Sequence, residues 1–176
     1  MKKIFYFILI SLFSLTVISC AKEDDSSSSD NSSSTTSSSS SSGLFVAVGA
    51  SGTLLTSPDG TTWTSRTSGT SNNLRSFAFD GSGTGVVVGY SGTILTSTDG
   101  ITWTSRTSGT SKNINNVAYG NSKFIAVGDN GTTLSSSDGI TWTDWTSSCG
   151  ANNNESLWDV AYGSSTWVAV GDNGSI

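Results

Sequence analysis

The chain has 176 residues, with 8 Lys and Arg against 13 Asp and Glu, so its formal net charge is −5, and it contains no His. The lack of His excludes Ser-His-Asp and Cys-His catalysis and any His-ligated metal site, and we expect neither a metal nor a cofactor. The acidic balance argues against a nucleic-acid partner, which would require clustered Lys and Arg. Charged residues make up only 12%, while Ser, Thr, Gly and Asn are abundant, which is typical of β-proteins with many turns.

Residues 1–19 have the pattern of a secretory signal peptide. A short basic start precedes an apolar run over residues 4–18. This run is too short for a membrane span, which needs about 20 apolar residues. It ends at Val17-Ile18-Ser19-Cys20, which resembles the bacterial lipobox. The resemblance implies that Cys20 is lipid-modified, becomes the mature N-terminus and anchors the chain in the bacterial outer membrane.

The segment after the predicted lipid anchor has two parts. Ala21-Lys22-Glu23-Asp24-Asp25 resembles the surface-export signal of some Gram-negative lipoproteins, which favours the cell surface over the periplasmic leaflet. Residues 26–42 contain 13 Ser, 2 Thr, one Asp and one Asn. Such a sequence cannot bury enough apolar surface to offset the entropy of ordering. We therefore predict a disordered tether over residues 20–42.

From residue 43 onward the sequence repeats about every 40 residues. Trp63, Trp103 and Trp142 are 40 and 39 residues apart, and residues 52–71 and 92–111 are identical at 17 of 20 positions. Each repeat contains four short strand candidates, the second and third joined by Ser-Gly or Asn-Gly, which accept positive φ. Four antiparallel strands in about 40 residues make one β-propeller blade, and a parallel β-helix is the structural alternative. The predicted division is a partial blade 43–74, blades 75–114 and 115–157, and a partial blade 158–176.

The predicted fold is thus all-β, with about three and a third four-stranded antiparallel blades. A closed propeller has about 4–8 blades. We therefore expect the propeller to be incomplete in this chain. Either the chain is part of a longer protein, or several chains associate to complete one ring.

The motif Ser-x-Asp-Gly-x-Thr-Trp occurs three times and resembles the Asp-box, or BNR, repeat of sialidase-like propellers and photosystem II assembly factor-like proteins. Each copy is one residue shorter than the familiar Ser-x-Asp-x-Gly-x-Thr-Trp, and the resemblance covers about residues 43–176. We expect the Asp to accept backbone N–H groups, the Gly to take the left-handed conformation and the Trp to wedge between neighbouring sheets. Recurrence in every repeat indicates a structural role. The residues are Asp59, Gly60, Trp63, Asp99, Gly100, Trp103, Asp138, Gly139 and Trp142.

The catalytic residues of sialidases cannot be transferred to this chain. Sialidase activity requires an arginine cluster, whereas the chain has three Arg, of which Arg66 and Arg106 hold equivalent repeat positions. We therefore predict no catalytic residues, and a binding or scaffolding function. The alternatives are a truncated glycan hydrolase and an assembly-factor-like propeller.

One connection departs from the repeat. The distances from Trp63 to Phe77 and from Trp103 to Val117 are 14 residues, but Trp142 to Val160 is 18, so an insertion lies within residues 145–158. This connection should lie at the same end of the blades as the turns between second and third strands. Aromatic and amide groups there suit a carbohydrate or protein ligand, and a tolerated insertion without function is the alternative. The candidate ligand-binding residues are Tyr90, Asp129, Trp145, Asn153, Glu155 and Asp172, with Cys149 in the same loop.

Overall fold

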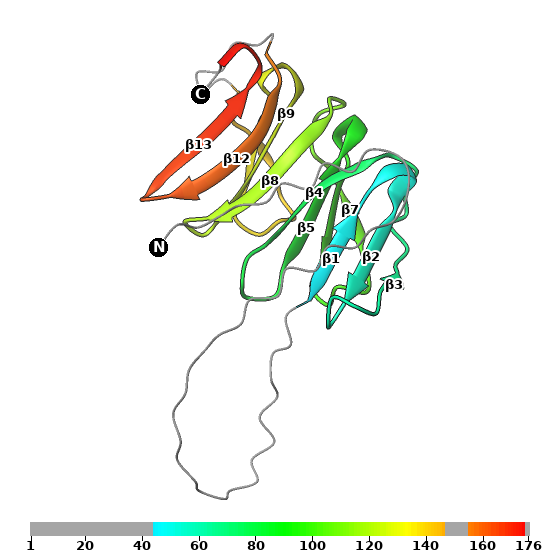
Figure 1. The fold of residues 1–176 in the computed structure, drawn as a ribbon. Helices are drawn as coiled ribbons and strands as arrows, with labels where there is room; N and C mark the ends of the chain where they lie inside the picture. Colours follow the sequence, from blue (N-terminus) through cyan, green and yellow to red (C-terminus); the bar gives the residue numbers. More distant parts are fainter. Residues whose placement is uncertain (1–43, 147–154, 175–176) are drawn as a thin grey trace, which may run out of the picture. The chain divides into compact units, whose positions relative to one another are not determined.

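The computed structural model describes residues 44–146 and 155–174, all of which belong to one unit, residues 40–176. The predicted signal peptide, Cys20 and the tether over residues 20–42 lie outside the described residues, as do Cys149 and Asn153. The described residues form antiparallel β-sheets joined by turns, without an α-helix among them (Figure 1). Within these ranges, no helical segment has the length and apolar character needed to cross a membrane.

Two complete four-stranded sheets lie in the middle of the chain, and in each the spatial order of the strands follows the sequence. The first of them contains β4 (Leu74–Phe79), β5 (Gly85–Gly89), β6 (Ile94–Ser97) and β7 (Thr104–Arg106). The other contains β8 (Ile114–Gly120), β9 (Lys123–Gly128), β10 (Thr133–Ser136) and β11 (Thr143–Asp144). All neighbouring strands pair antiparallel, as expected for propeller blades.

Two smaller sheets flank the complete ones. The N-terminal sheet contains β1 (Phe45–Val48), β2 (Leu54–Ser57) and β3 (Thr64–Ser65), with β1 at its edge, and the C-terminal sheet contains β12 (Leu157–Gly163) and β13 (Thr166–Gly171). The first strands of successive sheets, β4, β8 and β12, lie side by side, and β1 lies beside β4 (Figure 1). The fold is therefore an all-β propeller of four-stranded antiparallel blades that is incomplete within the described residues. We number the sheets as blades 1 to 4 in chain order.

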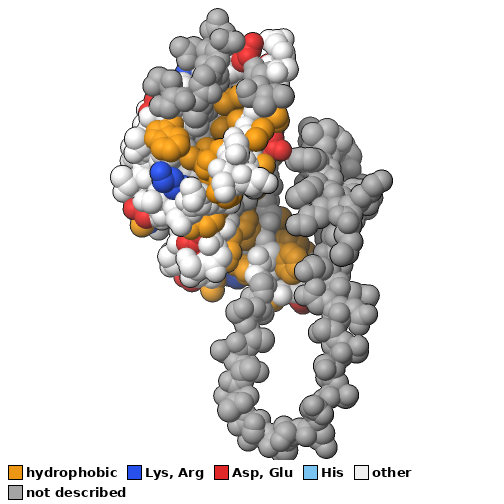
Figure 2. All heavy atoms as spheres, turned by 90° about the vertical axis from the view of Figure 1, so that its left-hand side faces the viewer, with side chains coloured by type: hydrophobic (Ala, Val, Ile, Leu, Met, Phe, Trp, Pro, Cys, Tyr) orange, Lys and Arg blue, Asp and Glu red, His pale blue; other side chains and the backbone are white. Residues whose placement is uncertain are grey.

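Apolar side chains from adjacent blades form the cores between them. Between blades 2 and 3, Val86, Ile114 and Phe124 are fully buried, and Trp142 packs against this cluster. A smaller cluster between blades 1 and 2 has Trp103 packed against it. The predicted wedging of a tryptophan between sheets is thus confirmed for Trp142 and Trp103. The C-terminal sheet exposes apolar side chains such as Val168 and Val170, and Figure 2 shows hydrophobic side chains on the side of the molecule where this sheet lies.

Short 3₁₀ turns join the second and third strands of blades 1 to 3, and a further one follows the second strand of blade 4. They are η1 (Ala50–Gly52), η2 (Tyr90–Gly92), η3 (Asp129–Gly131) and η5 (Asp172–Gly174). The middle residue of each turn has φ between 53° and 55°, and the following glycine is also left-handed, so the positive φ predicted for the Ser-Gly and Asn-Gly pairs is confirmed. A Cβ at Gly52 would overlap the carbonyl oxygen of Thr70, so the close approach of the next connection also requires glycine there.

Candidate ligand-binding site

The 3₁₀ turns and the connections between blades meet at one end of the sheets. Gly92 N donates to Lys112 O at 2.7 Å, and Gly131 N donates to Glu155 O at 2.6 Å. Each of these bonds joins a turn to the connection that leads into the next blade. We call this end, formed by the 3₁₀ turns and the beginnings of β4, β8 and β12, the turn end.

The predicted site residues of the turns lie at the turn end. Tyr90, Asp129 and Asp172 are the first residues of η2, η3 and η5, and Glu155 lies beside η3 through its backbone. Their role in ligand binding stays a prediction.

The first strand of each of blades 2, 3 and 4 contains a β-bulge near its start. The pairing register shifts between Leu74 and Ser76 in β4, and equivalent shifts occur in β8 and β12. The residues within the shifts are Arg75, Asn115 and Trp158. A bulge adds an unpaired residue and redirects its side chain.

In each blade the bulged residue meets the first residue of that blade's own turn. The guanidinium carbon of Arg75 lies 4.8 Å from the ring centroid of Tyr90. The Asn115 amide nitrogen donates to Asp129 Oδ1 at 3.0 Å. In blade 4 the indole nitrogen of Trp158 donates to Asp172 Oδ1 at 2.6 Å. We call these contacts the bulge–turn pairs.

The bulge–turn pairs differ in chemistry from blade to blade, although their scaffold is constant. A buried Leu or Ile precedes each bulged residue, and a glycine precedes each turn. Arg75 and Trp158 are exposed, whereas Asn115 is buried. The three bulge–turn pairs form a row along the blades. In this row Arg75 and Trp158 are accessible to a ligand, whereas the middle residue, Asn115, is not.

Side-chain hydrogen bonds around the middle pair join three consecutive blades. Asn113 Oδ1 accepts from Ser91 N at 3.1 Å, and Asn113 Nδ2 donates to Asp129 Oδ2 at 2.9 Å. Asn115 Nδ2 also donates to Leu157 O at 2.9 Å. Both carboxylate oxygens of Asp129 thus accept from amides of the scaffold, which gives Asp129 a structural task. The buried Asn115 Oδ1 has no hydrogen-bond partner among the described residues.

Trp145 lies apart from this row, just after β11. Its N–H donates to Thr133 O at 2.7 Å, and Lys123 Nζ lies 5.0 Å from its ring centroid. The half-buried ring packs against an apolar cluster of blades 3 and 4. The structure thus assigns Trp145 to the core between these blades. The cluster consists of Ile125, Val127, Leu157 and Val160.

The Ser-x-Asp-Gly-x-Thr-Trp segments form turns between the third and fourth strands, at the opposite end. We call them the Ser–Asp turns. Asp59 Oδ1 accepts from the backbone N–H groups of Thr61 and Thr62, both at 2.8 Å, and from Ser57 Oγ at 2.9 Å. The same three bonds recur in the other two copies, and Gly60, Gly100 and Gly139 have φ of 73°, 67° and 71°. The predicted bonds to Asp and the left-handed glycines are confirmed.

Hydrogen bonding keeps the carboxylates of the Ser–Asp turns charged. The N–H groups of Thr102 and Ile101 lower the pKa of Asp99 to about 2. The equivalent N–H groups hold the pKa of Asp59 and Asp138 below its ordinary value. Three such carboxylates in equivalent places fit a repeated building element. In the ranges 44–146 and 155–174, no three Asp, Glu, His or Cys side chains gather as a metal site would require.

The sequence pattern alone did not identify Arg75, Asn115 and Trp158 as site residues. A signal was present, because the residue after the Leu or Ile that starts each first strand changes from repeat to repeat. This variation does not reveal the bulge, because the alternation of apolar residues does not show where a strand gains an extra residue.

Comparison with known proteins adds evidence on the fold. No protein-family model and no curated protein matches the chain. The structure is similar to YCF48 from Cyanidioschyzon merolae, with a TM-score of 0.59 and 21% identity over 76% of this chain and 46% of that one. It is also similar to a structure of YCF48 bound to D1 peptide, with a TM-score of 0.53 and 17% identity over 76% of this chain and 45% of that one. The chain thus spans less than half the length of these proteins, and at this identity the likeness shows that the two share the β-propeller fold.

Proposed function

We propose that this chain is a lipid-anchored, surface-displayed β-propeller module that binds an extended segment of a protein partner at its turn end and has no catalysis of its own. The observation that carries this proposal is the change of chemistry along the bulge–turn pairs on a constant scaffold. A turn that serves only the fold can use the same residues in every repeat, as the Ser–Asp turns do. Stacked repeats create an extended binding surface, and recognition of a non-repetitive segment on it is served by different groups at successive positions.

The exposed members of the row have the chemistry of a protein interface. Arg75 offers a cation held against the ring of Tyr90, and Trp158 offers an aromatic face. Arg, Tyr and Trp are enriched among the residues that contribute most to protein binding. The guanidinium suits a carboxylate of the partner, and the indole suits an apolar or aromatic side chain.

Two further features support the proposal. One of the similar structures is of YCF48 with a D1 peptide, so a propeller of this kind can hold a peptide. The lipobox-like sequence ending at Cys20 supports a membrane anchor, which would place the partner at the outer membrane. Apart from these two features, the bonds within the Ser–Asp turns support a separate assignment, that these turns are Asp-box turns.

The proposal is tested by probing the full-length chain and its variants on arrays of short peptides and of glycans. We expect peptide binding, weakened about tenfold or more in Arg75→Ala and in Trp158→Ala, as for residues central to an interface. Ile140→Ala is the matched control, because Ile140 lies in a Ser–Asp turn and is 48% exposed, against 47% for Trp158. Peptide binding that survives both turn-end variants would refute the site. Binding to glycans alone would show that the ligand at this site is a carbohydrate and not a protein segment.

A further inference from the structure

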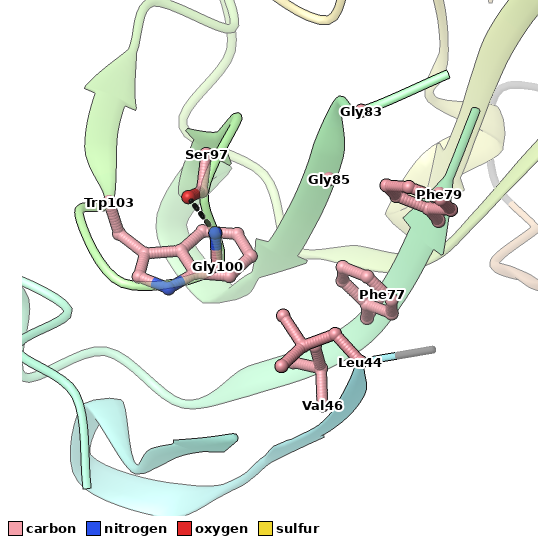
Figure 3. A pocket seen from close by; sticks show the side chains of 9 residues that line it. All are labelled: Leu44, Val46, Phe77, Phe79, Gly83, Gly85, Ser97, Gly100 and Trp103. Atoms are coloured by element: carbon pink, nitrogen blue, oxygen red, sulfur yellow. Dashed lines mark hydrogen bonds between the residues drawn. The ribbon is translucent and has the colours of Figure 1, made fainter. Parts of the chain in front are cut away.

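An apolar pocket of about 180 Å³ lies between blades 1 and 2, toward the end where the Ser–Asp turns lie. Leu44 and Val46 border it from blade 1, and Phe77, Gly85 and Trp103 border it from blade 2 (Figure 3). Its position sets it apart from the bulge–turn pairs, and the proposed function makes no use of it.

The pocket exists because blade 2 has glycine at a position where the other described blades have an aromatic residue. Phe45, Gly85 and Phe124 are equivalent, since each pairs with the Ser that begins its blade's Ser–Asp turn. In blade 4 the equivalent residue is Trp167, four residues before Gly171.

The next interface shows which group belongs in this space. Between blades 2 and 3, a Cβ placed on Gly139 would lie 2.9 Å from Val86 Cγ2, 3.3 Å from Thr84 Cγ2 and 3.5 Å from Phe124 Cε2. Phe124 is only 1% exposed there, so its ring completes the packing against the Ser–Asp turn.

Between blades 1 and 2 the equivalent residues are arranged in the same way, but no aromatic ring takes the place of Phe124. Leu44 takes the place of Thr84 and contacts Gly100, the equivalent of Gly139. Val46 takes the place of Val86. The equivalent of Phe124 is Gly85, which carries no side chain.

Phe77 fills only part of this space. It stands where the other blades have Val117 and Val160, and its Cε2 lies 2.9 Å from where a Cβ of Gly85 would be. Its ring meets Trp103 edge-on, with centroids 6.3 Å apart. The pocket remains beside these two rings.

Trp103 differs from its counterparts in the other blades. Trp63 and Trp142 donate their indole N–H to Gly60 O and Gly139 O at 3.1 and 3.0 Å. The buried Trp103 Nε1 has no hydrogen-bond partner in the described part of the chain. Blade 2 therefore departs from the repeat around the whole pocket, and not only at Gly85.

We propose that this pocket binds the ring of a Phe side chain from a protein partner. The volume suits the ring, since an apolar cavity of about 150 Å³ in a protein interior takes up benzene. The rim is open, because Leu44 and Phe79 are 45% and 51% exposed. Phe124 identifies the ring, since it occupies the equivalent space of the next interface.

The test uses N-acetyl-L-phenylalanine amide as the probe, titrated into the full-length chain and followed by NMR. We expect saturable shifts of the amide signals of Gly83, Gly85 and Gly100 and of the Trp103 indole N–H. The matched probe N-acetyl-L-alanine amide, which lacks the ring, should bind at least tenfold more weakly. Equal binding of the two probes, or no saturable shift at these residues, would overturn the proposal.

Two variants connect binding to the pocket. Phe77→Val with Gly85→Phe restores the Val and Phe of blade 3 and fills the space, so we expect at least a tenfold loss of probe binding, with folding checked by circular dichroism. Undiminished binding by this folded double variant would also overturn the proposal. Phe77→Val alone enlarges the pocket, and we expect it to shift preference severalfold toward N-acetyl-L-tryptophan amide. If the double variant fails to fold, the proposal is refuted when Phe77→Val shows the same preference between the phenylalanine and tryptophan probes as the native chain.

Discussion

Asn113 holds Asp129 in place from the connection between two blades: its Nδ2 donates to Asp129 Oδ2 at 2.9 Å, while its Oδ1 accepts from Ser91 N in the turn of the preceding blade. The earlier connection has an equivalent bond, in which Asn73 Oδ1 accepts from Ser51 N at 3.0 Å. These amides connect neighbouring turns by hydrogen bonds, and the apolar cores connect neighbouring sheets by packing. The bulge–turn pairs therefore stand on a framework whose spacing is set by the repeat.

Replacing Asn113 should destabilise the propeller more than replacing an asparagine with one side-chain bond. Asn113→Ala leaves Ser91 N and a carboxylate oxygen of Asp129 without their partner, and we expect a loss of about 1–3 kcal/mol in the free energy of unfolding. Urea denaturation measures it. Asn72→Ala is the control, since the Asn72 amide makes a single bond to Thr93 Oγ1 at 2.9 Å. Equal losses in the two variants would show that Asn113 does not link the blades.

The Ser–Asp turns predict a loss of stability in acid. The folded state holds the pKa of Asp99 at about 2, below its ordinary value of 3.8, because Thr102 N–H and Ile101 N–H bind the charged form. The unfolded state then binds more protons between these values, so this stabilisation is fully present above pH 3.8 and is lost as the pH falls toward 2.

Asp99→Asn should therefore lower the Tm at neutral pH and flatten its decline between pH 5 and 2, so that the variant and the native chain converge in acid. Thermal unfolding followed by circular dichroism checks this. Ile101→Asn keeps the carboxylate in the same turn and should retain the native pH profile. Parallel profiles for Asp99→Asn and the native chain would contradict the explanation.

Two glycines with the same φ allow the cost of a left-handed backbone to be distinguished from the cost of a steric overlap. Gly52 and Gly69 both have φ of 71°, but a Cβ at Gly52 would overlap Thr70 O, whereas nothing lies within 4 Å of one at Gly69. Gly69→Ala should cost about 1–2 kcal/mol, the penalty for an L-residue in the left-handed region. Gly52→Ala should cost clearly more, because backbone atoms must move. Similar free energies of unfolding for the two variants would show that the connection yields to the added methyl group.

The repeat made the blades predictable from sequence. The Ser-Gly and Asn-Gly pairs and the alternation of apolar residues predicted the antiparallel strands. The recurrence of Asp59 at Asp99 and Asp138 indicated a structural element that is repeated in each blade. The lengths of the strands were not predictable: the fourth strands β3, β7 and β11 contain only two or three residues each. The sequence pattern indicates which residues alternate, but the number of residues that pair in a strand depends on the neighbouring strand.

The site was less predictable for two physical reasons. Position in a loop did not show that Trp145 packs into a core, because burial depends on the next blade. The bulges that redirect Arg75 and Trp158 leave no mark in the hydrophobic pattern. The pocket is the opposite case, because Gly85 differs visibly from Phe45 and Phe124 when the repeats are aligned.

The lipid anchor is tested by a matched pair of cysteine variants. Cys20 follows the lipobox-like segment, and Cys149 is the other cysteine of the chain. In a Gram-negative host, the native chain and Cys149→Ser should fractionate with the membrane and incorporate labelled palmitate, because each buried CH₂ of an acyl chain contributes about 0.8 kcal/mol to membrane binding. Cys20→Ser should lose the label. Label that persists in Cys20→Ser would exclude this cysteine as the attachment site, whereas a native chain that takes up no label would refute the anchor and remove the reason to seek the partner at the membrane.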